Sequence, residues 1–209
     1  TPFIIIAMDN VMIITMNAIL QKYGGAERGD LLITCATIAQ SFMLVVTMPL
    51  GGITSGTQAV LAYNFGAGKT DRVKSAQKYI FILAAAYTAL LFVLARTIGV
   101  LFVRLFTADP IVAAEALRAI RIFTLAIIPL AFQYEIVDGF TGLGQVQVSL
   151  PLSFFRKCAY FVSLFLLPAM FGAEAAFYAE PVSDILGPIA SAIVYLTSMK
   201  KVLAKAGAN

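Results

Sequence analysis

Six long apolar stretches fill most of the chain, and short polar segments separate them. The stretches cover residues 2–20, 32–64, 73–106, 110–140, 148–171 and 175–203. An α-helix needs roughly 20 mainly apolar residues to cross the hydrocarbon core of a bilayer. The pattern therefore predicts an all-α integral membrane protein, in which residues 1–209 form one bundle of six transmembrane helices.

Composition argues against a soluble fold. Of the 209 residues, 60% are hydrophobic and only 12% are charged, whereas soluble domains carry about 25% charged residues. The net charge of +4 is typical of basic loops beside a membrane and does not indicate nucleic-acid binding. The chain opens inside an apolar run, with neither an initiator Met nor a basic segment before it. We therefore expect a piece of a longer protein and not a signal peptide.

Reactive residue types are scarce. The chain has no histidine, which is the commonest metal ligand and general base, and it shows no nucleophile motif. Cys35 and Cys158 are expected near opposite membrane faces, too far apart for a disulfide. Residues 66–70 end like a phosphate-binding loop, but Tyr63 occupies the place of that motif's first glycine. We expect neither an enzyme nor a metal site, and no cofactor.

Two of the apolar stretches contain residues that disturb helices. Pro49, Gly52 and Gly56 lie within 32–64, and Pro181 and Pro188 lie within 175–203. Proline removes a backbone hydrogen bond and kinks a helix, so both stretches are predicted to bend. Gly52 and Gly56 also have the spacing that lets two membrane helices approach closely. Helix packing and a pliable point for transport are both open interpretations of this pair.

Basic residues gather in alternate polar segments. Nine of the 15 fall on one predicted side, at the end of the second stretch, at the entry to the fifth, and in the tail: Lys69, Arg72, Lys74, Lys78, Arg156, Lys157, Lys200, Lys201 and Lys205. Loops rich in Lys and Arg face the cytoplasm. The pattern therefore predicts an inner cell-membrane protein with both ends of the chain in the cytoplasm.

Acidic residues inside the apolar stretches are the strongest functional signal. A charge at the centre of a membrane helix costs at least ~2.5 kcal/mol, so these residues should face protein or a water-filled cavity. Glu135 and Asp138 are three apart and share a helix face. Their proximity disfavours joint ionisation, which suits a proton carrier; alternatively, Asp138 lies at the cytoplasmic end and is solvated.

Other polar residues extend this predicted cavity. Asn10 and Asn17 are seven apart and lie on one helix face. Asp184 lies between two prolines, and broken helices often build ion sites in transporters; a hydrogen bond to a neighbouring helix is the alternative. The candidate residues for an ion-coupling or substrate cavity are Asp9, Asn10, Asn17, Gln133, Glu135, Asp138 and Asp184.

Several segments resemble one transporter family. The run from Pro49 to Gln58, with residues 63–73 (Tyr-Asn-Phe-Gly-Ala-Gly-Lys-Thr-Asp-Arg-Val), is similar to the second-helix signature of multidrug and toxic compound extrusion (MATE) transporters. Residues 105–110 resemble their turn before the fourth helix of a lobe. Residues 140–145 resemble a Leu-Arg-Gly-x-Gly-Asp element, from which Thr141 and Gln145 depart. Residues 180–184 resemble the last helix of the DinF-like subgroup.

The resemblance implies a fold and an activity. MATE transporters have twelve helices in two six-helix lobes, and this chain resembles the C-terminal lobe, with the N-terminal lobe as its partner. The family exports hydrophobic cationic drugs in exchange for H⁺ or Na⁺ by alternating access. Some members use an acidic residue in the seventh helix, near Asp9 or Asn10 here. The family's aspartate in the tenth helix falls near Leu130, so Glu135 and Asp138 rest on this sequence alone.

Two other functions stay open. A flippase for lipid-linked oligosaccharides belongs to the same superfamily, but such proteins usually have a more basic cavity, and the predicted buried charges here are acidic. The chain could also be a membrane scaffold that transports nothing. The sequence leaves the coupling ion and the range of substrates undecided.

Overall fold

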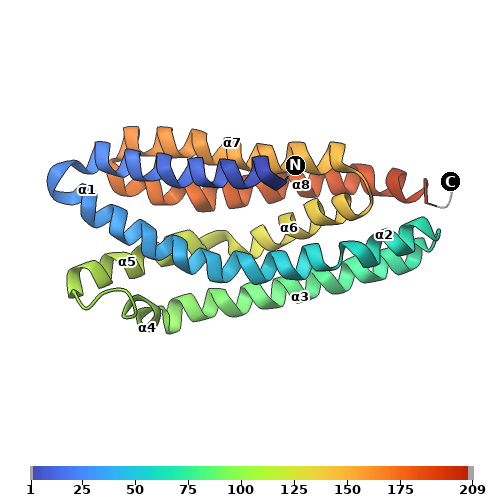
Figure 1. Ribbon diagram of the computed structural model, residues 1–209, viewed down its shortest axis with the longest axis horizontal. Helices are drawn as coiled ribbons and strands as arrows, with labels where there is room; N and C mark the ends of the chain where they lie inside the picture. The colour runs from blue at the N-terminus through green and yellow to red at the C-terminus, as the bar shows by residue number, and fades with distance from the viewer. Residues whose placement is uncertain (1, 207–209) are drawn as a thin grey trace. The chain divides into compact units, whose positions relative to one another are not determined.

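The computed structural model describes residues 2–206, and it describes side chains from Ala7 onward. Every regular element in this range is a helix, which confirms the all-α prediction (Figure 1). The elements are α1 (Pro2–Gly56), α2 (Gln58–Gly66), α3 (Thr70–Thr97), α4 (Gly99–Val103), α5 (Pro110–Phe123), η1 (Thr124–Ala126), α6 (Ile127–Gly142), α7 (Val146–Phe171), η2 (Ala173–Tyr178) and α8 (Ala179–Leu203).

Four helical stretches among the described residues are long and apolar enough to cross a membrane: Ala7–Gly66, Thr70–Thr97, Val146–Phe171 and Ala173–Leu203. The first has 60 residues and is several times longer than one crossing requires. It contains the first two predicted spans. The predicted span 110–140 is missing from the four because the 3₁₀ turn η1 divides it into α5 and α6.

A single glycine separates the first two predicted spans. Gly25 has φ 67° and ψ −167°, and it is the one residue of α1 with non-helical dihedral angles. This region of φ strongly favours glycine, because it lacks a Cβ atom. The sequence predicted a polar segment between the stretches 2–20 and 32–64, whereas in the structure the helix resumes directly after Gly25.

The start of α5 follows its sequence signal. The Asp109 side chain accepts hydrogen bonds from the backbone N–H of Ile111 at 2.8 Å and of Val112 at 3.4 Å, and Pro110 is the first helical residue. Asp at the N-cap and Pro at the first position satisfy or remove N–H groups that a helix start leaves unpaired. The predicted helix start is confirmed.

The predicted bending residues lie in mostly regular helix. Pro49 is inside α1 and Pro188 is inside α8, while Pro181 is the third residue of α8. α1 ends at Gly56, and α2 starts two residues later. A Cβ atom on Gly52 or Gly56 would meet nothing within 4 Å, so no described residue packs closely against this pair.

The chain folds into two compact units, which are described separately. Unit 1 comprises Thr1–Leu44, Val93–Leu125 and Lys157–Ser183; unit 2 comprises Val45–Phe92, Ala126–Arg156 and Asp184–Asn209. In unit 1, Phe42 packs edge-on against Phe102 at 5.1 Å between ring centroids, and Phe123 against Phe177 at 5.9 Å. Aromatic contacts of this kind stabilise a fold by more than the burial of their surface area alone.

Unit 2 has a core built from α2, α3, α6, α7 and α8. Its buried members are Leu61, Val73, Ile80, Ile136, Phe140, Leu143, Leu152, Met199, Val202 and Leu203. The helices α2 and α6 approach closely, because a Cβ atom on Gly142 would lie only 3.1 Å from the Gln58 backbone. This contact gives a packing reason for glycine in the 140–145 segment.

Candidate functional site

Polar side chains from five elements of unit 2 meet beside its apolar core. Asp138 of α6 accepts a hydrogen bond from the Thr54 hydroxyl at 2.5 Å and another from Gln58 Nε2 at 2.9 Å. Thr54 belongs to the last turn of α1, and Gln58 is the first residue of α2. The carboxylate of Asp138 therefore bridges the break between these two helices.

Glu135 lies one turn before Gly139 on the same helix, and its environment differs from that of Asp138. Its side chain is completely buried, and neither carboxyl oxygen has a hydrogen-bond partner among the described residues. Burying an ionised carboxylate without compensation is very costly. The Glu135 carboxyl is therefore expected to hold a proton or to bind a cation.

A glutamine from α3 converges on the same place. A Cβ atom on Gly139 would lie 2.9 Å from Gln77 Nε2 and 3.6 Å from Glu135 Oε1, so both groups flank this glycine. Gln77 accepts a hydrogen bond from the Tyr195 hydroxyl at 3.3 Å, while its buried Nε2 has no partner in residues 2–206. The missing Cβ of Gly139 leaves the space in which these groups meet.

A buried ion pair forms a second polar site in unit 2. Arg156 Nη1 of α7 lies 3.1 Å from Asp184 Oδ1 of α8, and the side chains are 15% and 0% exposed. Gln133 borders this pair, because a Cβ atom on Gly187 would lie 2.2 Å from Gln133 Oε1 and 3.0 Å from Arg156 Cγ. Glycine at 187 thus makes room for the Gln133 amide and the aliphatic stem of Arg156.

The next residue of α7 forms an ion pair in unit 1. Lys157 Nζ donates to Asp9 Oδ1 of α1. The lysine side chain is 3% exposed, whereas the aspartate side chain is 50% exposed. The half-exposed carboxylate of Asp9 is thus already neutralised by the buried ammonium of Lys157.

The placement of Arg156 and Lys157 corrects the sequence analysis. They were predicted at the membrane entry of their helix, but α7 begins at Val146, so they lie about 15 Å along it. Both are paired with aspartates. The predicted cytoplasmic side keeps seven of the 15 basic residues, and six lie elsewhere in the chain. The buried charges are also not purely acidic, contrary to the prediction.

The predicted site residues divide between the two units. Gln133, Glu135, Asp138 and Asp184 belong to unit 2, and Asp9, Asn10 and Asn17 belong to unit 1. Asn10 is exposed, and Asn17 is partly buried. The sequence analysis did not propose several of the interacting residues: Thr54, Gln58, Gln77, Arg156, Lys157 and Tyr195. The two glutamines carried a usable signal, since both are amides in or beside apolar stretches.

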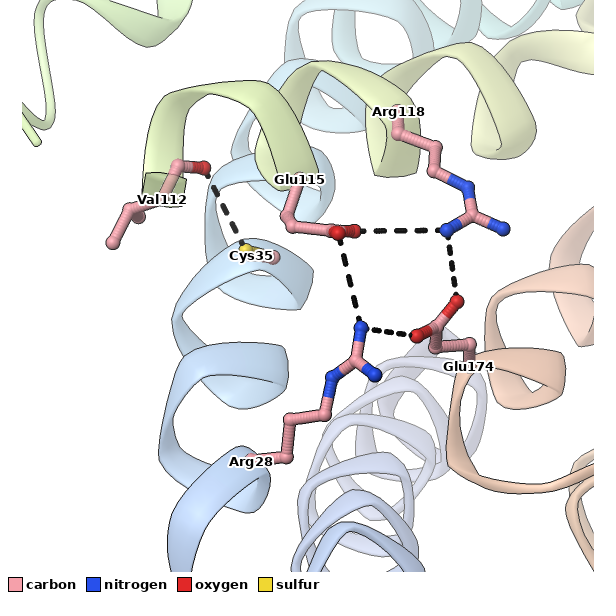
Figure 2. A network of polar contacts seen from close by, with 6 residues as sticks. All are labelled: Arg28, Cys35, Val112, Glu115, Arg118 and Glu174. Carbon is pink, nitrogen blue, oxygen red and sulfur yellow. Dashed lines mark hydrogen bonds and ion pairs between the residues drawn. The ribbon is translucent and has the colours of Figure 1, made fainter. Parts of the chain in front are cut away.

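A separate ionic network ties three elements of unit 1 together (Figure 2). Arg28 of α1 lies 2.5 Å from Glu174 of η2 and 3.8 Å from Glu115 of α5. Arg118 of α5 lies 2.8 Å from Glu174 and 3.8 Å from Glu115. A cavity of about 380 Å³ adjoins it, lined by Tyr23, Gly24, Arg28, Leu32, Phe171, Gly172, Ala173 and Glu174. The closed ring of alternating charges has a structural role in joining α1, α5 and η2.

Replacing Glu174 with glutamine should lower the thermal unfolding midpoint modestly. The change removes the negative charge from both short contacts to the arginines, but the side chains are 30–55% exposed. Exposed pairs contribute ~0.2–1 kcal/mol each, so we expect a loss of about 1 kcal/mol that shrinks at high salt. Glu27→Gln is the matched control, because Glu27 is exposed and forms no ion pair among the described residues. Equal midpoints for the two variants would contradict this role.

Long apolar helices with charges buried between them define a multi-pass membrane protein with a polar interior. Among the described residues, no group of three or more His, Cys, Asp or Glu side chains could hold a metal ion. A family model described as MatE matches residues 6–166, which is more than half of the chain, so this chain belongs to the MatE family. The MatE family is one of transporters and not of enzymes.

Solved structures with the same fold agree with this assignment. A structure described as MATE in the bent conformation superposes with a TM-score of 0.84 at 16% identity, covering 98% of this chain and 45% of its own. An outward-facing multidrug resistance MATE family transporter of the MOP superfamily gives 0.82 at 15% identity, covering 95% and 44%. At these identities the likeness shows the fold.

A third solved structure is described as having a different function. It is a MOP superfamily transporter from Pyrococcus furiosus, for which reverse polarity of the binding pocket is said to suggest a different function. It superposes with a TM-score of 0.80 at 16% identity and covers 95% of this chain and 44% of its own. No curated protein matches this chain. The chain thus spans less than half the length of the structures it matches.

Proposed function

We propose that this chain forms the C-terminal lobe of a secondary transporter that exports hydrophobic cationic drugs in exchange for H⁺ or Na⁺. Family membership supports transport, and the half-length match to MATE structures supports a single lobe. An N-terminal lobe and the lipid bilayer are the implied partners. Transport would proceed by alternating access of a cavity between the two lobes.

The observation that carries the coupling proposal is the isolation of Glu135. Its two buried oxygens accept no hydrogen bond from residues 2–206. An acidic group in this state is costly when ionised and stable when it holds a proton or a cation. An ion carrier needs this difference in stability between its occupied and its empty state, because release of the ion must change the free energy of the transporter. Gln77 and Tyr195 would supply the neighbouring polar groups.

Asp138 and Asp9 have supporting roles in this proposal. Asp138 already accepts two hydrogen bonds, which stabilise its ionised form without a bound cation. Asp9 is paired with Lys157, so a cationic substrate or coupling ion that binds there must compete with a lysine ammonium. We place Glu135 as the ion carrier and Asp9 as a polar group of the cavity.

Gradient-driven dye transport tests the proposal. The complete protein that contains this chain would be reconstituted in vesicles with ethidium as the cationic probe. We expect ethidium transport when a pH or Na⁺ gradient is imposed, and no transport when the gradient is collapsed by an ionophore. If ethidium does not move under either gradient, although the protein is inserted and folded, the export proposal is wrong and the non-transporting scaffold is favoured.

The buried basic pair favours a second candidate function. Lys157 is buried in α7 and Arg156 is mostly buried, so the interior charges are not solely acidic. An anionic cargo, such as a lipid-linked oligosaccharide diphosphate, would then be the substrate of a flippase from the same superfamily. The vesicle assay separates the two if a fluorescent lipid diphosphate replaces ethidium, since each candidate predicts transport of one probe only.

The membrane side is also a proposal. Seven basic residues remain at the α2–α3 turn, in α3 and at the end of α8. Following the rule that basic loops stay inside, we propose an inner cell-membrane location with the ends of this chain in the cytoplasm. This orientation can be tested in sealed vesicles. Protease cleavage at Lys200 or Lys205, or labelling of a cysteine introduced at either position, should occur from one side of the membrane only.

A further inference from the structure

One end of unit 2 carries seven exposed basic side chains, here called the basic end. Four belong to the α2–α3 turn and the first turns of α3, and three to the end of α8: Lys69, Arg72, Lys74, Lys78, Lys200, Lys201 and Lys205. Figure 1 shows the α2–α3 turn and the C-terminal end of α8 at the same end of this unit. Neither the predicted ion cavity nor the drug pathway uses these residues.

Core packing brings the two groups of basic residues together. Val73, which lies between Arg72 and Lys74, belongs to one buried cluster with Met199, Val202 and Leu203 of α8. About two turns further along α3, Phe81 packs edge-on against Tyr195 of α8 at 6.0 Å between ring centroids. The start of α3 and the end of α8 are therefore adjacent, and their lysines and arginine form one surface.

The charge of this surface is almost uncompensated. Among the described residues, its one ion pair joins Lys74 to Asp71 at 3.6 Å, and both side chains are largely exposed. In unit 1, by contrast, Arg28 and Arg118 are neutralised by Glu115 and Glu174. Like charges held this close repel each other, so the basic end needs anions from outside the chain.

Neighbouring side chains indicate where those anions come from. Tyr63 and Tyr79 are 71% and 70% exposed, and exposed tyrosines are enriched where membrane helices pass the lipid headgroups. One turn beyond Lys78 on α3, Ile82 is exposed, and one turn before Lys200 on α8, Leu196 is exposed. Each helix thus presents apolar surface, suited to acyl chains, directly beside its basic residues.

We propose that the basic end is a binding surface for anionic phospholipids. The lysines and Arg72 contact the headgroup phosphates, the two tyrosines lie at headgroup level, and the acyl chains run along the exposed apolar residues of α3 and α8. Clusters of four to eight basic residues at the end of membrane helices are the usual basis of such recognition. The proposal holds for either membrane side and does not depend on the transported cargo.

Competitive lipid retention tests this proposal. The complete protein in detergent would receive equal amounts of phosphatidylglycerol and phosphatidylcholine with identical acyl chains, and bound lipids would be counted by native mass spectrometry. We expect preferential retention of phosphatidylglycerol, weakening as salt rises. In the K200Q/K201Q/K205Q triple variant, this preference should fall about tenfold or more, because each basic residue near an anionic surface contributes roughly fivefold.

Matched variants separate charge from folding. The K200R/K201R/K205R variant keeps the charges and should keep the preference, and K69Q/R72Q/K78Q should lose it as the other glutamine triple does. Exposed basic residues of unit 1 supply the control, K22Q/R104Q, which should bind like the unmodified protein. Equal retention of the two lipids, an unchanged preference in both glutamine triples, or displacement by excess inorganic phosphate would overturn the assignment.

Discussion

Replacing Arg156 with methionine should lower the free energy of unfolding by ~3–5 kcal/mol, the usual cost of removing one partner from a buried ion pair. Methionine is of similar length and apolar, so it keeps much of the packing of the arginine stem. The loss arises because Asp184, which is completely buried, would keep its negative charge without the guanidinium 3.1 Å away. Denaturation in mixed micelles, followed by helical content, would measure the change.

A double-mutant cycle makes this prediction specific to the pair. Arg156→Met/Asp184→Leu should recover most of the stability that either single change loses, because no uncompensated charge remains. Arg104→Met provides the control: Arg104 is exposed, and surface substitutions usually change stability by less than ~0.5 kcal/mol. If the two single losses simply add in the double variant, the charges are not coupled and the pair has no energetic role.

The all-α fold could be predicted from the sequence because its signals are local. Length and uninterrupted apolarity mark the spans, and Asp109 with Pro110 marks the start of α5 through contacts two and three residues away. The bend at Gly25 was placed in a longer loop, since three glycines and several charges suggested an end to the helix. One glycine with positive φ is sufficient to reverse the chain direction, and sequence alone does not show that the flanking residues stay helical.

The ion-pair partners of the candidate-site residues could not be predicted from local sequence signals. Arg156 and Asp184 are 28 residues apart, and Lys157 and Asp9 are 148 apart. The acidic residues were identified because an isolated charge in an apolar stretch is conspicuous. Arg156 and Lys157 gave the same signal, but they were counted with the basic residues at the entry to their helix. In the structure, ten residues of α7, nearly three turns, precede Arg156, so both basic residues lie well inside the helix.

The pair Glu135 and Asp138 shows the same limit at closer range. Their spacing correctly places both on α6, but it does not show which of the two carboxyls is hydrogen-bonded. The structure distinguishes them through other helices: Thr54 and Gln58 donate to Asp138, whereas Glu135 receives no hydrogen bond from residues 2–206. Which of two nearby acids is satisfied depends on tertiary contacts, and these decide which one is available to an ion.

Replacing Glu135 with glutamine should therefore reduce gradient-driven cation export to the level of protein-free vesicles while leaving the fold at least as stable. Glutamine has nearly the same shape but can neither release a proton nor hold a negative charge. Since a neutral amide avoids the cost of a buried uncompensated carboxylate, the free energy of unfolding should stay constant or rise. Ethidium flux under pH and Na⁺ gradients, together with a denaturation curve of the same preparation, would measure both effects.

Asp138→Asn is the internal comparison for this prediction. Asparagine keeps one oxygen to accept from Gln58 Nε2, and its amide nitrogen can donate to the Thr54 hydroxyl oxygen, so we expect the helix contacts and a substantial part of the flux to persist. Glu27→Gln, at an exposed position in unit 1, controls for the loss of any carboxylate. Normal flux in Glu135→Gln combined with its loss in Asp138→Asn would move ion binding three residues along α6. Because both acids share one helix face, only this pair of variants can tell a carboxyl that carries the ion from one that holds α1 and α2 in place.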